Sequence, residues 1–151
     1  MGFVYELLKF VHIASAIVAV GGNVTYGVWN ARSAGEPAHM GFVLKGVKFI
    51  DNRIANPAYG LLFLTGLIMV FAGHWGPQLW VIVAIVLFIV VAALGFGVFT
   101  PLLRRQIELV DAGDTTSSEF KRLAMRSRLL GPILGLITAV ILVMMVFKPT
   151  L

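Results

Sequence analysis

Polar and apolar residues alternate along this chain in long blocks, and four of the apolar blocks hold no formally charged side chain. These windows are Phe10–Trp29, Ile54–Gly73, Leu79–Phe99 and Leu129–Phe147. A helix needs about 20 mostly apolar residues to cross about 30 Å of hydrocarbon. The spans must be helical because lipid cannot satisfy an open backbone. The pattern therefore predicts four membrane-spanning helices, over residues of about 7–30, 54–74, 78–101 and 128–148.

The composition excludes a soluble domain and a disordered chain. Of the 151 residues, 59% are apolar and 13% are charged, and the mean hydropathy is +0.94. A soluble fold of about 150 residues cannot hide so much apolar surface, and disorder needs low hydrophobicity and high charge. We therefore expect an all-α integral membrane four-helix bundle, in which residues 1–151 form a single membrane domain.

Basic residues are distributed unevenly among the connections between the windows. The first and third connections carry Arg32, Lys45, Lys48, Arg53, Arg104, Arg105, Lys121, Arg122, Arg126 and Arg128. The short second connection, 73–78, carries none. Under the positive-inside rule, both basic connections are cytoplasmic and both termini face outward, across a bacterial cytoplasmic (inner) membrane. The net charge of +5 is then explained by the lipid bilayer, and no nucleic-acid partner is expected.

Short helical features are also predicted in the connections. Apolar residues recur at helical spacing at Met40, Val43, Val47, Ile50 and Ile54. This spacing predicts a short amphipathic helix on the cytoplasmic surface between spans one and two. Residues 116–119, Thr-Ser-Ser-Glu, match a capping box, so a helix should begin there and continue into span four. Pro101 and Pro132 are expected to kink spans three and four.

Most polar residues of the first two windows fall on one helix face, since successive residues advance by about 100°. In span one this face is formed by His12, Ser15, Ala16, Ala19, Asn23, Tyr26 and Asn30. In span two it is formed by Asn56, Tyr59, Gly60, Phe63, Leu67, Val70 and His74. Such faces should turn inward toward other helices in a bilayer.

Side chains that can bind a metal are expected to converge in the outer half of the bundle. Imidazole and thioether groups are usual axial ligands of haem, and the chain has no cysteine for covalent attachment. We therefore predict a non-covalent haem b between the helices, with a redox or small-ligand-binding role. The axial ligand would be His12, with His74 or Met145 as a second ligand. The other predicted cofactor-binding residues are Ser15, Asn23, Tyr26, Arg53 and Asn56.

Other interpretations of these residues stay open. A cofactor-free assembly or transport component would use the polar face for helix association only. A quinone- or lipid-binding protein would use Tyr26, Asn23 and His12 as hydrogen-bonding groups. No carboxylate lies in any window, so a relay through paired acids is not expected. Span three is apolar all round, which is compatible with lipid contact or with a homodimer interface.

The first two windows resemble a known family. The stretches Leu8–Trp29, LKFVHIASAIVAVGGNVTYGVW, and Asn52–Val70, NRIANPAYGLLFLTGLIMV, are similar to an uncharacterised bacterial family of predicted integral membrane proteins. The similarity extends more distantly to HemJ-type protoporphyrinogen oxidases and CopD-type copper-resistance membrane domains. The HemJ resemblance implies haem b binding by His12 and an oxidoreductase activity. Val20 and Arg32 occupy the positions nearest to the tryptophan and arginine–histidine signature of those enzymes.

If haem is bound, the purified protein has a Soret band, and His12→Ala removes it because the imidazole holds the iron. Visible absorption spectroscopy of protein from haem-sufficient cells measures this. A colourless, fully folded wild type would contradict haem binding and leave a cofactor-free or a quinone- or lipid-binding role.

Overall fold

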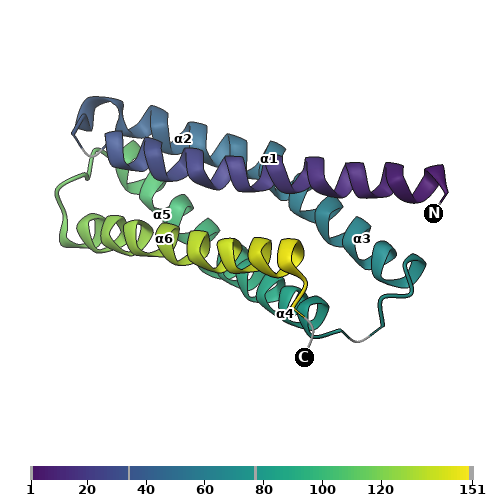
Figure 1. The fold of residues 1–151 in the computed structure, drawn as a ribbon. Helices are drawn as coiled ribbons and strands as arrows, with labels where there is room; N and C mark the ends of the chain where they lie inside the picture. The colour runs from purple at the N-terminus through teal and green to yellow at the C-terminus, as the bar shows by residue number, and fades with distance from the viewer. Residues whose placement is uncertain (1, 34, 77, 150–151) are drawn as a thin grey trace.

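The structure is a computed structural model that describes residues 2–33, 35–76 and 78–149. Within these residues it is helical apart from short connections, and four helices are long and apolar enough to cross a bilayer. Successive helices run in opposite directions, so both ends of the chain lie at the same end of the bundle (Figure 1). The predicted four-helix membrane bundle is confirmed.

The helical elements include the predicted spans and extend beyond them. In chain order they are α1 (Phe3–Ser33), η1 (Pro37–His39), α2 (Met40–Ile50), η2 (Asp51–Ala55), α3 (Asn56–Ala72), α4 (Leu79–Leu94), η3 (Gly95–Phe99), α5 (Thr100–Asp111) and α6 (Ser118–Phe147). The short η1 is a 3₁₀ helix, whereas η2 and η3 are π-helical segments inside longer helices. The chain thus forms four rods, of which the second covers Pro37–Ala72 and the third covers Leu79–Asp111.

The predicted amphipathic helix is present as α2, but it is not a separate helix lying on the membrane. It continues through η2 into α3 without a break. Its buried residues, Leu44 and Val47, belong to a core that also contains Leu103 and Ile107 of α5. Of the predicted apolar positions, Val47 lies in this core and Met40, Val43 and Ile50 pack against it, so the spacing serves a contact between helices.

Each π segment comes directly before a helix with proline in its first turn. Pro57 and Pro101 are the second residues of α3 and α5. Proline has no N–H with which to continue the α-helical ladder, and a π turn shifts the hydrogen bonds one residue further back. At η3 both the backbone N–H and the hydroxyl of Thr100 donate to the Gly95 carbonyl, the latter at 3.1 Å. The helix before Pro101 therefore contains a π bulge, and the kink expected there stays a prediction.

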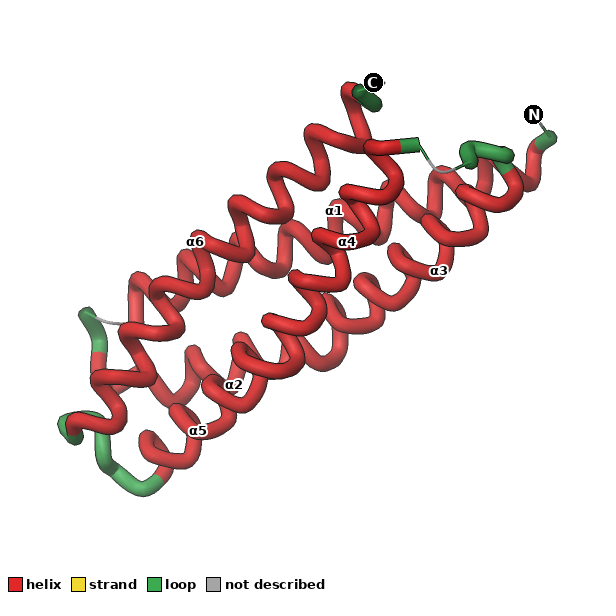
Figure 2. The backbone as a smooth tube through the Cα atoms, turned by 90° about the horizontal axis from the view of Figure 1, so that it is seen from below, coloured by secondary structure: helices red, strands yellow, loops and turns green. Residues whose placement is uncertain are grey.

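The four rods associate as two pairs. The first pair is α1 with α3 and the second is α4 with α6, while α1 also contacts α6. At the end opposite the termini, α2 packs on α5, and Figure 2 shows these two helices side by side. We call this the basic end, because it carries the basic residues of positions 32–53 and 104–128.

A compact core lies at the basic end. It is formed by side chains that are at most 8% exposed, namely Tyr26, Leu44, Val47, Ala55, Phe99, Leu103 and Ile107. Elsewhere many large apolar side chains point outward, such as Phe71 and Val146, each 73% exposed. A soluble monomer rarely exposes so much contiguous apolar surface. This distribution is typical of helices whose outer faces contact lipid.

The helix leading into span four begins one residue later than the capping box predicts. Ser117 is the N-cap, and its hydroxyl accepts from the backbone N–H of Phe120 at 3.1 Å. Glu119 pairs instead with Arg105 of α5, whose Nε lies 2.8 Å from Oε1. This guanidinium holds the pKa of the Glu119 carboxyl below its usual range. The helix then continues through Pro132 to its last residue.

Leu103→Ala is expected to lower the free energy of unfolding by about 2–5 kcal/mol, because truncation in a packed core leaves a cavity. Leu103 is 1% exposed, whereas Phe42 of α2 is 83% exposed. Phe42→Ala is therefore the control, with an expected change of within about 0.5 kcal/mol. Thermal unfolding in detergent measures both. Equal losses would show that the basic end is not where the core lies.

Candidate functional site

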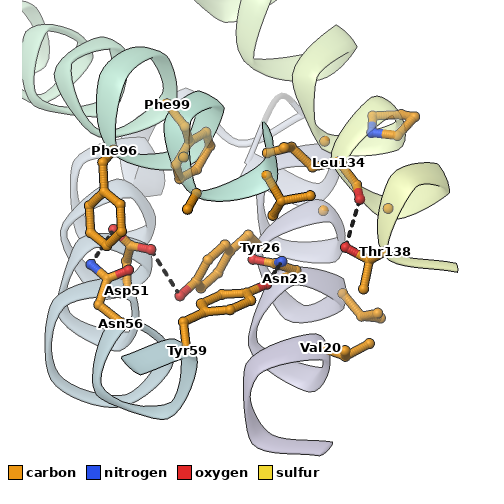
Figure 3. Close-up of a pocket in the computed structure, with 18 of the residues that line it drawn as sticks. Val20, Asn23, Tyr26, Asp51, Asn56, Tyr59, Phe96, Phe99, Leu134 and Thr138 are labelled. Carbon is orange, nitrogen blue, oxygen red and sulfur yellow. Dashed lines mark hydrogen bonds between the residues drawn. The ribbon is translucent and has the colours of Figure 1, made fainter. Parts of the chain in front are cut away.

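A cavity of about 1060 Å³ lies between the two helix pairs. Its walls come from α1, α3, α4 and α6, and both π segments contribute to them. Figure 3 shows side chains from these elements converging on it. Cavities of about 300–1,000 Å³ are typical of small-molecule sites, and π segments are frequent at functional sites. This cavity is the candidate functional site.

Glycines help to keep this space open. Gly27 of α1, Gly60 of α3, and Gly131 and Gly135 of α6 all line the cavity. A Cβ added to any of them would meet no atom within 4 Å. The cavity therefore exists in part because side chains are missing from positions on three of its helices.

One wall of the cavity is polar. The side-chain amide of Asn23 donates a hydrogen bond to the hydroxyl of Tyr59. Tyr26 donates to one oxygen of the Asp51 carboxylate across 3.5 Å, and Asn56 donates to the other across 3.5 Å. These five side chains come from α1, η2 and α3 and lie close together in Figure 3. We call them the polar wall; most of the remaining lining is apolar.

Tyr26 and Asp51 anchor the polar wall. The Tyr26 side chain is 5% exposed and stacks on Phe99 of η3, with ring centroids 6.1 Å apart. Asp51 is 7% exposed and receives hydrogen bonds from Tyr26 and Asn56. A buried carboxylate needs such donors because its desolvation is costly. The pair therefore holds α1 against the second rod.

Tyr59 has a hydroxyl hydrogen that is available to a bound molecule. Its oxygen accepts from Asn23, and among the described residues the hydroxyl donates to no acceptor. Its ring packs edge-on against Phe88 of α4, with centroids 6.0 Å apart. The packing fixes the ring, so the hydroxyl is a positioned donor in the cavity wall.

Asp51 is a wall residue that the apolar windows do not predict. The second window begins after it, which is why no carboxylate was expected inside a span. In the structure the second rod starts well before Asp51 and buries it. The signal that could have found it is spacing: Leu44, Val47, Asp51 and Ala55 recur every three or four residues and are all buried. A helix face that is continued past position 50 includes the carboxylate.

The structure brings three of the eight predicted cofactor-binding residues to the cavity: Asn23, Tyr26 and Asn56. The other five do not line it. Ser15 is buried in α1, Met145 is half-buried in α6, and Arg53 and His74 are exposed. His74 follows the end of α3 with a φ of 50°. The cavity lies nearer the basic end than the outer half in which His12, His74 and Met145 are expected.

His12 lies at the contact between α1 and α3. The Thr65 hydroxyl donates to the Leu61 carbonyl at 2.6 Å, so its oxygen accepts from the Nδ1–H of His12 at 3.0 Å. Gly66 makes room for the ring, because a Cβ added there would lie 2.8 Å from His12 Cε1. The imidazole therefore joins two helices through Nδ1 and keeps a lone pair on Nε2.

The cavity does not offer the ligand set predicted for haem b. Among the residues that the structure describes, no histidine and no methionine lines it. Within 2–33, 35–76 and 78–149, no three His, Cys, Asp or Glu side chains gather as a metal-binding group. A phenol such as that of Tyr26 can ligate haem iron, but this phenol is bonded to Asp51. Haem binding by His12 stays a prediction that concerns a place outside the cavity.

The fold and the cavity together define a polytopic α-helical membrane protein with a hollow between its helices. The chain belongs to the family described as Predicted integral membrane protein (DUF2269), whose sequence pattern matches residues 6–149. No curated protein and no solved structure matches the chain. The predicted membrane family is thus confirmed over nearly the whole chain.

Gly66→Ala is expected to lower the free energy of unfolding by about 1–3 kcal/mol, because the added methyl overlaps the His12 ring. Gly60→Ala on the same helix is the matched control, since its Cβ would meet no atom within 4 Å. Thermal unfolding in detergent measures both. A His12→Ala substitution should make Gly66→Ala nearly harmless, since the ring is then gone. Identical stability of the two glycine variants would contradict the contact with His12.

Proposed function

We propose that this protein binds a membrane-soluble amphiphile, a quinone or a lipid, in the cavity between its helix pairs. The proposal is carried by one observation: a cavity of about 1060 Å³ with largely apolar walls and one polar wall, between helices long enough to span a bilayer. Protein interiors are close-packed, and unfilled space forfeits dispersion contacts along its whole lining. An apolar tail inside the cavity would restore those contacts.

The polar wall suits the head of such a molecule. Quinone rings and glycerolipid esters both present carbonyl oxygens, which accept hydrogen bonds and donate none. Tyr59 has a free hydroxyl hydrogen and is held in place by Asn23 and by the ring of Phe88. A ligand carbonyl at Tyr59 would orient the molecule along the wall, because a few placed polar groups fix orientation in mostly apolar sites.

The ligand would enter sideways from the lipid. Several lining side chains are well exposed, among them Val24 at 64%, Phe96 at 57% and Leu142 at 42%. These come from three different rods, which supports an opening between the helices. A tail that is already dissolved in lipid loses no hydration when it moves between such side chains.

Haem b binding with His12 as axial ligand is a second proposal. A HemJ-like activity, a homodimer and a location in a bacterial inner membrane are also proposals. One observation favours the ligand role. The Nδ1–H of His12 donates to Thr65 and leaves the Nε2 lone pair, as metal-ligating histidines commonly do. The absorption measurement on His12→Ala tests this site separately, because His12 does not line the cavity.

Filling the cavity is expected to weaken binding. In Gly135→Leu the new side chain would project into the open space around that position, so the affinity for an amphiphile should fall by on the order of ten-fold or more. Native mass spectrometry in detergent measures this, with decylubiquinone and dioleoylphosphatidylglycerol titrated separately. Gly60→Leu on α3 is a second filling variant.

Gly21→Leu is the matched control. Gly21 also has no atom within 4 Å of an added Cβ, but it does not line the cavity. All three leucine variants should unfold at or above the wild-type temperature, since leucine favours a helix over glycine. Binding that is lost in both filling variants and kept in Gly21→Leu supports the site. Equal affinity of all four proteins for both probes, or no binding by the wild type, would overturn it.

A further inference from the structure

A second, smaller cavity adjoins the first at the basic end. Its volume is about 320 Å³, and it lies among the last turn of α1, the α2 and α5 helices and the first turns of α6. Asn30, Ser127 and Arg128 line both cavities. The two spaces are therefore neighbours along one path, from the apolar interior of the bundle to its charged end. We call the smaller one the head pocket.

The head pocket is basic and its charges are unneutralised. Lys121 and Arg128 line it, and among the described residues no carboxylate does. Two other basic side chains at this end are paired: Lys45 lies 2.7 Å from Asp111, and Arg105 lies 2.8 Å from Glu119. Neither Lys121 nor Arg128 forms a salt bridge within the part of the chain that the structure describes. Two free cations at the mouth of an apolar cavity favour an anionic occupant.

Gln106 of α5 also lines the head pocket and has an unmet hydrogen bond. The residue is 4% exposed, and its buried Oε1 has no donor among the described residues. An unsatisfied buried acceptor is destabilising, so native structures rarely keep one without a reason. An occupant that brings a donor as well as a negative charge would satisfy this oxygen once the side chain turns toward the pocket.

We propose that the head pocket binds the head group of a phospholipid, with the phosphate at Lys121 and Arg128 and a head-group hydroxyl or ammonium donating to Gln106 Oε1. This rests on the proposed function, since it places the acyl chains in the larger cavity. It also selects between the two ligand classes, because a quinone has neither a phosphate nor a donor at its head. Phosphatidylglycerol supplies hydroxyl donors, phosphatidylethanolamine supplies ammonium donors, and phosphatidylcholine supplies no donor.

The position of the head pocket along the rods fits this ligand. Arg128 directly precedes the uncharged window Leu129–Phe147, and Asn30 directly follows Phe10–Trp29. Both residues therefore lie where the apolar part of the bundle ends, where the border between hydrocarbon and lipid head groups is expected. The head group of a phospholipid bound in the two cavities would then lie at the same depth as the head groups of the surrounding bilayer.

The charge contacts are tested with two double variants of equal net charge. Lys121→Gln with Arg128→Gln removes the head-pocket cations, and Arg122→Gln with Arg126→Gln removes two neighbours that do not line it. Native mass spectrometry in detergent gives the affinity for dioleoylphosphatidylglycerol. The first pair should weaken binding by roughly ten-fold to a hundred-fold, as lost charge-assisted hydrogen bonds do. The second pair should stay within about two-fold of the wild type.

The donor is tested by changing the lipid. The wild type should bind dioleoylphosphatidylethanolamine roughly ten-fold more tightly than dioleoylphosphatidylcholine, because the two lipids have the same net charge and only the former offers a donor, as expected from one charge-assisted hydrogen bond. Gln106→Leu should abolish this preference and leave the affinity for phosphatidylcholine unchanged. Because Gln106 is buried, Gln106→Met is made as a second apolar variant, and both must unfold cooperatively in detergent to be counted.

The outcomes separate the two proposals. Equal effects of the two double variants, or a preference for phosphatidylethanolamine over phosphatidylcholine that survives both Gln106 variants, would overturn the head pocket. If decylubiquinone binds and Gly135→Leu abolishes it while no phospholipid binds, the proposed function stands and the phospholipid assignment is wrong. If neither probe responds to Gly135→Leu, the larger cavity itself is not the binding site.

Discussion

Hydrocarbon offers no hydrogen-bond partner, and this constraint governs both the backbone and the polar side chains of the protein. Each backbone N–H and C=O must be paired within its own helix. Of the three rods with an internal proline, the second and third contain π segments, and α6 continues through Pro132 as an α-helix. The Gly95 carbonyl, for example, accepts hydrogen bonds from the backbone N–H and the hydroxyl of Thr100 across η3. Polar side chains obey the same rule in pairs: His12 bonds to Thr65, Asn23 to Tyr59, and each pair joins α1 to α3.

The cavity is the space that this arrangement of helices leaves between the two pairs. Hydrogen-bonded polar pairs join α1 to α3, and α4 packs against α6. The glycines of α3 and α6 leave the space between these two pairs unfilled. The core that closes the bundle is displaced to the basic end, where Tyr26 stacks on Phe99 and contacts Asp51. The π segments place Asp51 and Phe99 in the cavity lining. The same deviation from the α-helix therefore lets the rod continue past its proline and supplies residues to the site.

The proposed binding role rests on the order of environments along one line. Apolar walls lie between the helix pairs, the polar wall lies beside them, and free cations lie at the basic end, where Arg128 borders both cavities. An amphiphile in a bilayer has the same order of groups from tail to head. His12, the predicted haem ligand, lies outside this line, at the contact between α1 and α3. Haem binding there is a separate proposal.

The length and placement of the four spans could be predicted from the sequence, because a run of apolar residues either does or does not match the thickness of hydrocarbon. Asn23, Tyr26 and Asn56 could also be predicted as inward-facing, because helical spacing alone puts them on polar faces. Asp51 could not be found by counting apolar residues, since its burial depends on η2 packing against α1. The cavity and the exclusion of His12 from it were decided by tertiary structure only. They depend on how the helices rotate and how closely they approach, and those quantities are set by contacts between residues far apart in the chain.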